Sequence, residues 1–431
     1  MEKKSVLFIG GNFSPEPTGI GKYSGEMIEW LSEKGVSCTV ITTFPYYPFW
    51  KVQVPYKKRS FWFKTEIKQT SKSAAPIRII RAPHYIPSKP TATRRMISDF
   101  SFFFSAYLVI LVLLFYKKRD YVIAVAPPFQ LGLLAKLYKK VKGAKFVYHI
   151  QDLQIDAARD LHMIKSPAIL KFLFAIEKFI LKSTDHISTI SPGMVRKVQA
   201  KCKKDILLFP NWVDTRQFFP VADKEQLKRK FGFKNEDKII LYSGAIGEKQ
   251  GLETILYCAE HLQKDKKLKF VICGSGPYKE KLKILKDRLG LQNVIFYPLQ
   301  PMEKFNEFLN MADIHLLLQK INASDLVMPS KLAAILSIGG LAIVTATKDT
   351  SLYDIVSSSN VGVLVAPENQ SALITAIEAS LRNENTVINI NARLYAELHL
   401  SHDKVLNRFS SSLFKIKTSY NKEDVTVLSF E

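Results

Sequence analysis

The sequence is poor in cysteine, and the few cysteines that it has are not arranged as ligands or disulfide pairs. Cys38, Cys202, Cys258 and Cys273 lie far apart, and no C-x-x-C motif or Cys/His cluster occurs. Neither a disulfide framework nor a structural zinc site is therefore indicated, and a reducing compartment fits best. The start, MEKKSVLFIGG, has only a short apolar run that enters a glycine loop, so we interpret it as a strand and not as a signal peptide.

Acidic residues are also scarce, because the 431-residue chain holds 62 Lys and Arg against 39 Asp and Glu, a net charge of +23. The excess is uneven: residues 1–205 hold 34 basic and 14 acidic residues, whereas residues 206–431 hold 28 and 25. Lysine used only for solubility would be spread evenly. A basic half instead points to a polyanionic partner, which could be nucleic acid, anionic lipid or a phosphorylated substrate.

No apolar run reaches the roughly 20 residues of a typical membrane span. The longest, Phe100 to Tyr116 (FSFFFSAYLVILVLLFY), has 17 residues and lies between expected strands of one sheet. A spanning helix would split that sheet, so we expect a buried or lipid-touching domain helix. Upstream, Phe44 to Lys64 interleaves nine aromatic residues with basic ones. Such a stretch is typical of a membrane interface, and it would also suit stacked single-stranded nucleic acid.

The length predicts two domains of about 200 residues each. In both halves short β-branched runs alternate with helical patterns, which indicates α/β domains with parallel sheets. We expect two Rossmann-like, doubly wound domains that face one another across a cleft, over residues 1–207 and 208–385, followed by a helix and polar tail over 386–431. The expected strands are 6–10, 37–43, 77–81, 121–126, 145–150 and 186–190 in the first domain, and 238–243, 269–273, 294–297, 314–318, 341–345 and 361–365 in the second.

The opening loop, GGNFSPEPTGIGKYS, carries Gly19 and Gly21 between a strand and a helix. Its spacing only approaches the dinucleotide fingerprint, and the second strand ends in Thr43 and Phe44 where that fingerprint needs an acidic residue to hold ribose. A nicotinamide site is therefore disfavoured. A plain flexible turn and a loop that approaches another ligand both remain open.

Other strand ends carry further candidate site residues. His149 and Asp152 close one strand of the first domain. In the second domain, the candidates for phosphate contacts lie after expected strands or at expected helix starts. They are Gly244, Lys249, Gly274, Gly276, Ser330 and Lys331. Helix starts of this composition present backbone amides, hydroxyls and an ammonium to an anion, which predicts a diphosphate site.

Several longer motifs carry a family resemblance. GIGKYSGEMIEWLSEKGVSCTVITTFPYYP, HIQDLQ, ISPGM, NWVD, YSGAIGEKQGLETIL, GSGP and MPSKL occur in this order. Over about residues 5–385 the chain resembles glycosyltransferases of the GT-B fold in family four, in particular bacterial enzymes that build colanic acid, O-antigen and capsule. The resemblance implies a nucleotide-sugar donor held by the second domain, an acceptor held by the first, and transfer with retention at the anomeric carbon. It also implies no metal and no cofactor beyond the donor, which we expect to be UDP-linked, and no D-x-D triplet occurs.

The resemblance also assigns roles to residues. The loop with Gly19 and Gly21 matches the loop that closes over the donor, and His149 matches a histidine near the transferred sugar that, with Asp152, would orient and not attack. Lys249 lies near a basic phosphate-binding position, and Gly274 and Gly276 near base and ribose. The chain departs from the family pattern at two places in the donor site. Ala245 stands where many relatives have an arginine, and Leu326 and Ala334 stand where the E-x7-E motif has its glutamates. Lys331 and nearby amides would therefore make more of the contacts to the donor.

These inferences together predict a retaining glycosyltransferase that is cytoplasmic and peripherally attached to the inner face of the cell membrane. Its partners would be a nucleotide sugar, a lipid-linked glycan acceptor and an anionic membrane surface, with no nucleic acid. A sugar-nucleotide 2-epimerase of the same fold is an alternative, although it has no use for a basic, aromatic first domain. A nucleic-acid-binding protein is a second alternative, but it leaves the phosphate-type loops of the second half unexplained.

Overall fold

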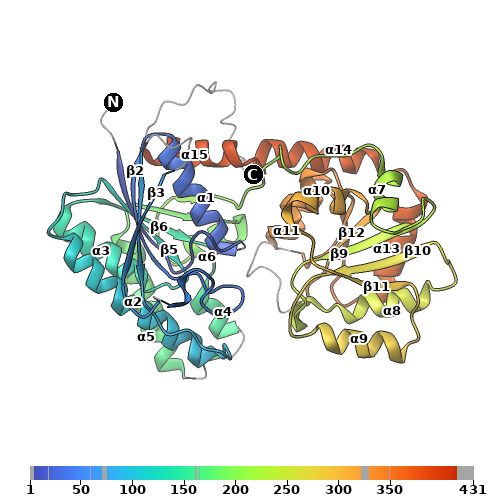
Figure 1. The fold of residues 1–431 in the computed structure, drawn as a ribbon, viewed down its shortest axis with the longest axis horizontal. Helices are drawn as coiled ribbons and strands as arrows, with labels where there is room; N and C mark the ends of the chain where they lie inside the picture. The colour runs from blue at the N-terminus through green and yellow to red at the C-terminus, as the bar shows by residue number, and fades with distance from the viewer. Residues whose placement is uncertain are drawn as a thin grey trace.

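The structure is a computed structural model that describes residues 4–17, 19–58, 60–69, 75–160, 163–164, 166–321, 330–348 and 350–414. Two α/β domains lie side by side, each built around a mainly parallel sheet with helices on both faces (Figure 1). The predicted pair of Rossmann-like domains is thereby confirmed.

The first domain contains an eight-stranded sheet of order β3-β4-β2-β1-β5-β6-β7-β8, parallel except for β3 against β4. Its strands are β1 (Ser5–Ile9), β2 (Ser37–Thr43), β3 (Lys64–Lys68), β4 (Ile77–Ala82), β5 (Tyr121–Ala126), β6 (Lys145–Ile150), β7 (His186–Thr189) and β8 (Ile206–Leu208). The central strands are continuous apolar runs because helices cover both of their faces. Six of the eight were predicted; β3, a polar edge strand, and the three-residue β8 were not.

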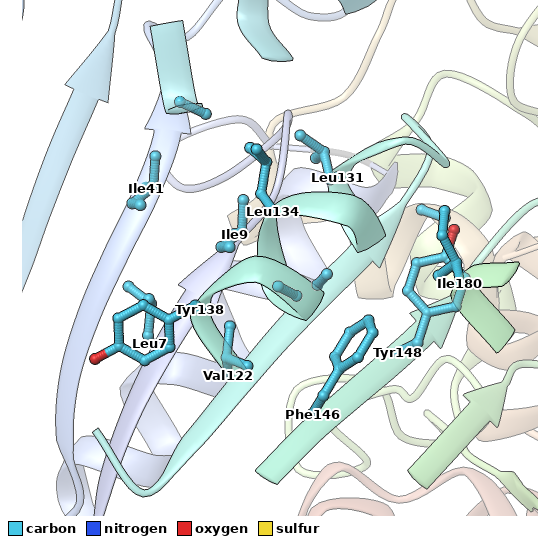
Figure 2. Close-up of a cluster of buried hydrophobic side chains, with 14 of the residues drawn as sticks. Leu7, Ile9, Ile41, Val122, Leu131, Leu134, Tyr138, Phe146, Tyr148 and Ile180 are labelled. Atoms are coloured by element: carbon cyan, nitrogen blue, oxygen red, sulfur yellow. The ribbon is translucent and has the colours of Figure 1, made fainter. Parts of the chain in front are cut away.

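The helices of the first domain fall into two layers. They are α1 (Gly19–Glu33), η1 (Tyr56–Lys58), α2 (Ala92–Leu113), α3 (Leu131–Lys142), α4 (Gln154–Asp160), α5 (Pro167–Ser183) and α6 (Pro192–Gln199). Helices α2, α3 and α5 cover one face of the sheet, and α1 covers the other. Figure 2 shows part of the first layer, where side chains of α3 and α5 lie over β1, β5 and β6; the labelled residues are Leu7, Ile9, Ile41, Val122, Leu131, Leu134, Tyr138, Phe146, Tyr148 and Ile180.

Helix α2 contains most of the long apolar segment. Phe102, Ala106 and Ile110 are buried against the sheet and α3, whereas Phe104 and Leu108 are 63% and 53% exposed. Among the described residues it is the one helix that is long and apolar enough to cross a membrane, and one third of its apolar stretch is buried. In this fold it is a partly buried domain helix with an apolar outer face.

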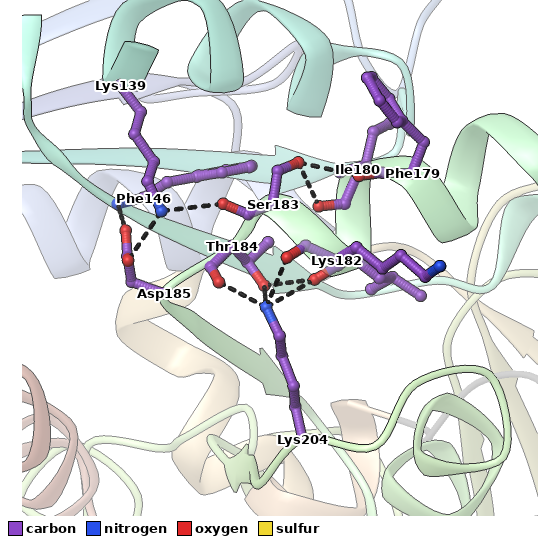
Figure 3. Close-up of polar contacts among 10 residues, drawn as sticks. Lys139, Phe146, Phe179, Ile180, Lys182, Ser183, Thr184, Asp185 and Lys204 are labelled. Carbon is purple, nitrogen blue, oxygen red and sulfur yellow. Dashed lines mark hydrogen bonds and ion pairs between the residues drawn. The ribbon is translucent and has the colours of Figure 1, made fainter.

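Two lysines close the carboxyl end of α5 (Figure 3). Lys204 Nζ donates to the carbonyl oxygens of Leu181, Lys182 and Thr184 at 3.0, 2.9 and 2.6 Å. Lys139 Nζ donates to the Ser183 carbonyl at 3.0 Å and to Asp185 at 2.7 Å. Cations are favourable at a helix carboxyl end. Part of the positive charge of the first domain is therefore used internally.

The second domain contains a parallel six-stranded sheet of order β11-β10-β9-β12-β13-β14. Its strands are β9 (Lys238–Ser243), β10 (Leu268–Cys273), β11 (Val294–Tyr297), β12 (Ile314–Leu317), β13 (Ala342–Thr345) and β14 (Val363–Val365). Its helices are α7 (Lys224–Lys230), η2 (Glu248–Gln250), α8 (Glu253–His261), α9 (Lys279–Arg288), α10 (Met302–Asn310), α11 (Ser330–Ser337), α12 (Ser351–Ser359) and α13 (Gln370–Arg382). All six strands were predicted, with ends that differ by two residues at most.

The carboxyl-terminal segment differs from the single helix that the sequence predicts. Helix α14 (Thr386–Tyr395) packs on the second domain, a π-helical turn follows (Ala396–Leu400), and α15 (His402–Phe414) returns to the first domain. There Phe409 stacks on Phe209 at 3.8 Å between ring centroids, and the Tyr121 hydroxyl donates to the Leu413 carbonyl. A helix whose partners lie hundreds of residues away in sequence cannot be assigned to them from its own pattern. The predicted polar tail over 415–431 lies outside the described residues.

The carboxyl edges of the two sheets face one another. Helix α6, which follows β7, meets helix α12, which follows β13: the Gly193 amide donates to the Ser351 hydroxyl at 2.6 Å, and Arg196 lies 3.4 Å from Asp354. In open α/β sheets ligands bind beyond the carboxyl ends of the strands. Both sets of strand-end loops therefore border the region between the domains.

Candidate active site

Two glycine loops of the second domain are locked together by backbone hydrogen bonds. The Gly244 amide donates to the Cys273 carbonyl at 2.9 Å, and the Ile246 amide donates to the Ser275 carbonyl at 2.8 Å. A Cβ at Gly274 would lie 1.9 Å from the Gly244 carbonyl oxygen, and one at Gly276 would lie 2.1 Å from the Ile246 carbonyl oxygen. The glycines after β9 and β10 are therefore required by the close approach of the loops.

Lys331, in the first turn of α11, lies directly under the β9 loop. Its Nζ is enclosed, although the side chain as a whole is partly exposed, and it has no hydrogen-bond partner among the described residues. The ammonium group lies 3.9 Å from the centroid of the Tyr242 ring, and burial lowers the pKa of Lys331 to about 7. An enclosed cation without a counter-charge is costly. An anion at this position would supply the missing charge.

Other predicted donor contacts fall outside what the structure describes. Lys249 lies in the short helix η2, but its side chain is not among the described ones, and the same holds for the side chain of Ser330. Residues 322–329, which include Leu326 and the start of MPSKL, are not described either. The roles of these residues remain predictions.

The opening loop of the first domain is organised by Glu16, which sequence reasoning missed. This buried carboxylate accepts hydrogen bonds from the amides of Tyr46 and Tyr47, both at 3.0 Å, and from Asn12 at 2.9 Å. Burial raises the pKa of Glu16. A Cβ at Gly21 would lie 2.6 Å from Glu16 Oε2, so this glycine makes room for the carboxylate.

The two residues predicted to orient the reaction have different surroundings in the structure. His149 lies at the end of β6 with its ring 3% exposed, and its Nδ1 is 3.0 Å from the Ser188 hydroxyl. Its ring centroid is 5.1 Å from that of Phe209, and burial lowers its pKa to about 3, so the imidazole is neutral. Asp152 lies beyond the strand end in the turn before α4. His149 thus supports the turn from within the domain, whereas Asp152 lies in the turn itself.

A second polar cluster, also missed by sequence reasoning, lies at the same edge of the first sheet. Asp99 of α2 accepts a hydrogen bond from Gln154 of α4 at 2.8 Å, and burial raises the pKa of Asp99 to about 6. His84, after β4, lies against the rings of Tyr46 and Phe102, with its Nε2 enclosed and without a hydrogen-bond partner among the described residues. The sequence does offer one indication that Asp99 is special, because it is the only acidic residue between Glu66 and Asp120.

The fold and this geometry define the class of protein. Two Rossmann-like domains with facing strand ends, and an enclosed cation under the glycine loops of one of them, form a GT-B-fold enzyme. Sucrose-phosphate synthase (tll1590) from Thermosynechococcus elongatus aligns with a TM-score of 0.73 at 15% identity, covering 95% of this chain and 98% of that chain. Alr3699/HepE of Anabaena in complex with UDP and glucose aligns with a TM-score of 0.66 at 12% identity, covering 96% and 100%.

The chain belongs to the group 1 glycosyl transferases. The family model of that description matches residues 223–396, and a model of the glycosyl transferase 4-like domain matches residues 18–212. The chain is 38% identical over 419 residues, 95% of this chain and 99% of the relative, to a protein of Escherichia coli (strain K12) described as a colanic acid biosynthesis glycosyl transferase, WcaI. The predicted resemblance and the prediction of a glycosyltransferase are both confirmed.

Proposed function

We propose that the protein transfers a sugar, with retention at the anomeric carbon, from a UDP-sugar to a lipid-linked saccharide during surface polysaccharide synthesis. The observation that carries the proposal is the enclosed ammonium of Lys331 below the β9 loop, which has no hydrogen-bond partner within the part of the chain that the structure describes. The description of the WcaI relative and the UDP and glucose bound to the structural neighbour HepE support the substrate class. The proposal needs no cofactor besides the donor.

The chemistry follows from the charge that develops on the donor. When the bond between the anomeric carbon and the diphosphate breaks, negative charge grows on the leaving oxygen, and Lys331 would stabilise it together with the amino end of α11. The acceptor hydroxyl attacks the same face of the sugar, and its proton passes to the departing phosphate. His149 and Asp152 orient the groups that border the sugar and form no bond to it.

The first domain offers a surface for the lipid part of the acceptor. On α2 the exposed apolar side chains Phe100, Phe104, Leu108 and Val112 recur every four residues and form a continuous stripe. In the aromatic loop before β3, Phe49 and Trp62 are 71% and 68% exposed. We call the four residues of α2 the apolar stripe and the segment before β3 the aromatic loop.

Helix α5 extends this surface. It exposes Ile169, Phe172 and Phe179 beside Lys171 and Lys178, and α3 lies between α2 and α5 in contact with both. Apolar rings with neighbouring lysines suit the headgroup region of an anionic bilayer. We therefore propose attachment to the cytoplasmic face of the cell membrane, where a lipid-linked acceptor would be presented.

Calorimetry with UDP tests the donor assignment. Charge-assisted contacts to phosphate contribute about 1.5–3 kcal/mol, so Lys331→Met should weaken UDP binding about tenfold or more. Lys230→Met is a matched control because Lys230 pairs with Glu307 on the surface of the same domain. Equal UDP affinity in wild type and Lys331→Met would remove Lys331 from the donor site.

Incubation with UDP-, GDP- and dTDP-sugars in the presence of membrane lipid extract tests the reaction. We expect UDP release that depends on the extract, and a product with the anomeric configuration of the donor. Conversion of the sugar nucleotide without any acceptor would instead support the 2-epimerase alternative.

A further inference from the structure

The polar cluster around Asp99 has no role in the function proposed so far. Its members come from four segments that all follow carboxyl ends of the first sheet. Tyr46 and Trp50 follow β2, His84 follows β4, Asp99 lies in the second turn of α2, and Gln154 opens α4 after β6. The topology thus brings them to the edge that borders the region between the domains.

The Asp99 carboxylate is the centre of this cluster. Its Oδ2 accepts a hydrogen bond from Gln154 Nε2 at 2.8 Å, and the Gln154 side-chain oxygen accepts one from the Phe129 amide at 3.2 Å. Gln154 lies two residues beyond Asp152. Asp99 is therefore coupled to the turn that His149 supports and in which Asp152 lies.

The Tyr46 ring near Asp99 belongs to a group of aromatic rings; burial raises the pKa of the Tyr46 hydroxyl, and the charge of Asp99 adds to that effect. The Tyr46 ring lies 4.8 Å from the ring of His84 and 5.5 Å from that of Trp50, and the Arg95 guanidinium lies 4.9 Å above Trp50. Tyr47, which is 38% exposed, has its ring 6.4 Å from Trp50 and approaches Gly19 of the opening loop. Exposed ring edges thus lie between the glycine loop and α2.

Burying the Asp99 carboxylate in these surroundings lowers the stability of the folded protein. Burial raises the pKa of Asp99 to about 6, which means that the folded chain holds this charge at neutral pH against a desolvation penalty. An asparagine would make the same hydrogen bond with Gln154 at no such cost. A carboxylate with aromatic neighbours is the usual composition of a site that fixes a polar ligand by a few convergent groups.

We propose that Asp99, Tyr47 and Trp50 form an acceptor subsite that binds a neutral pyranose ring. The carboxylate accepts hydrogen bonds from sugar hydroxyls, and the aromatic side chains contact the ring. A phosphate is disfavoured here because Asp99 and the nearby Glu16 would repel it. The inference rests on the proposed function, since it places the saccharide of the acceptor beside the apolar stripe that begins one residue further along α2.

Asp99 acts in this subsite as a specificity-determining residue. It takes no proton from the acceptor, because in the proposed reaction that proton passes to the leaving phosphate. Through Gln154, a sugar bound at Asp99 would also fix the turn that holds Asp152. Acceptor binding would thereby order the same turn that borders the transferred sugar.

Saturation-transfer NMR with the complete chain tests the subsite. The probes are the methyl glycosides of glucose, galactose, fucose and N-acetylglucosamine, measured in the presence and absence of UDP. At least one glycoside should bind wild type, and Asp99→Asn should weaken that binding about tenfold, the loss expected for a hydrogen bond to a charged group. Asp160→Asn is the control, because Asp160 is an exposed carboxylate on the same helix as Gln154.

A pH titration of wild type keeps the test valid if Asp99→Asn folds poorly. Glycoside binding should weaken as pH falls from 7.5 to 5, because a protonated carboxyl is a poorer acceptor. The charged and titratable groups that interact with Asp99 are Arg95 and Tyr46, with Glu16 beyond Tyr46. His84 packs against Tyr46, and because burial lowers its pKa to about 3 it does not titrate in this range.

The outcomes separate this inference from the proposed function. Glycoside binding that is absent in wild type, or equal in wild type and Asp99→Asn, overturns the subsite. Failure of UDP to bind while a glycoside binds through Asp99 overturns the donor assignment and supports the subsite. UDP and the glycoside would bind to different domains, so the two binding results can be interpreted independently.

Discussion

The ammonium group of Lys331 occupies the space that a side chain at position 244 would fill. A Cβ built on Gly244 would lie 2.7 Å from Lys331 Nζ and 2.9 Å from its Cε. The glycine that follows β9 and the lysine in the first turn of α11 thus depend on one another, although they are 87 positions apart in sequence. A phosphate-binding role for Lys331 therefore requires glycine at position 244.

Gly244→Ala should weaken UDP binding about tenfold, because the new methyl group displaces the ammonium and removes a charge-assisted contact. The matched control is Gly232→Ala. Both glycines have positive φ, at 151° and 84°, but a Cβ at Gly232 meets no atom within 4 Å. Calorimetry on both variants separates backbone strain, which they share, from displacement of Lys331. Equal UDP affinity in the two variants would contradict the dependence.

UDP binding should take up a proton at alkaline pH. Burial lowers the pKa of free Lys331 to about 7, so above that pH the amine is largely neutral and must be protonated to meet the diphosphate. The affinity should be nearly constant below pH 7 and fall by up to about tenfold per pH unit above it. Calorimetry in buffers of different ionisation enthalpy would detect the proton. Lys331→Met should abolish both effects, and a flat profile in wild type would argue against them.

His149→Ala should lower kcat more than it weakens UDP binding. The imidazole fills space between Ser188 and Phe209 under the strand end, so its loss would loosen the turn that carries Asp152. We expect kcat to fall about tenfold or more and the Kd for UDP to stay within about twofold, the pattern of a residue whose loss affects the transition state more than donor binding. Ser188→Ala, which keeps the ring but removes its hydrogen bond, should have a smaller effect. A parallel loss of binding and turnover would mean that His149 has only a structural role.

The strands of both sheets could be predicted from sequence because most of them are buried on both faces and appear as unbroken apolar runs. Strand β5 (YVIAVA) is an example, because all six of its residues are buried and its short, β-branched apolar run is typical of a central parallel strand. The edge strand β3 was missed because KTEIK contains a single apolar residue, Ile67, which is exposed. Helix α15 was not assigned to the first domain because its partners, Phe209 and Trp212, lie almost 200 residues upstream.

The candidate site was less predictable than the fold. The glycine loops and Lys331 stood out because glycines after strands, with a lysine at a helix start, have the composition of an anion-binding site. Glu16 and Asp99 did not stand out, because the sequence does not indicate whether a single carboxylate will be buried. Their significance appears only when the fold surrounds them with Tyr46, Asn12 and Gln154.

Asp99→Asn should stabilise the folded protein at neutral pH and less so at low pH. A raised pKa means that folding binds protons, so wild type loses stability as pH rises from about 4 through about 6. At about 1.4 kcal/mol per pKa unit, the cost at pH 7.5 is up to about 3 kcal/mol, and the asparagine variant does not incur it. Thermal unfolding at pH 5 and pH 7.5 measures the difference. A variant that is equally or less stable than wild type at pH 7.5 would show that Asp99 is held by favourable contacts and not for ligand binding.

Sedimentation with liposomes tests the membrane surface. Each Lys or Arg near an anionic bilayer contributes roughly 1 kcal/mol, so wild type should bind vesicles that contain anionic lipid and dissociate in high salt. The double variant Phe104→Ser/Leu108→Ser removes two members of the apolar stripe that are exposed, and it should reduce binding about tenfold without loss of thermal stability. Ile284→Ser is the control, because Ile284 is 69% exposed on the second domain. Equal binding to neutral and anionic vesicles at any salt concentration would instead indicate insertion of α2. No binding to either kind of vesicle would contradict membrane attachment and would mean that the basic first domain binds a soluble polyanionic acceptor.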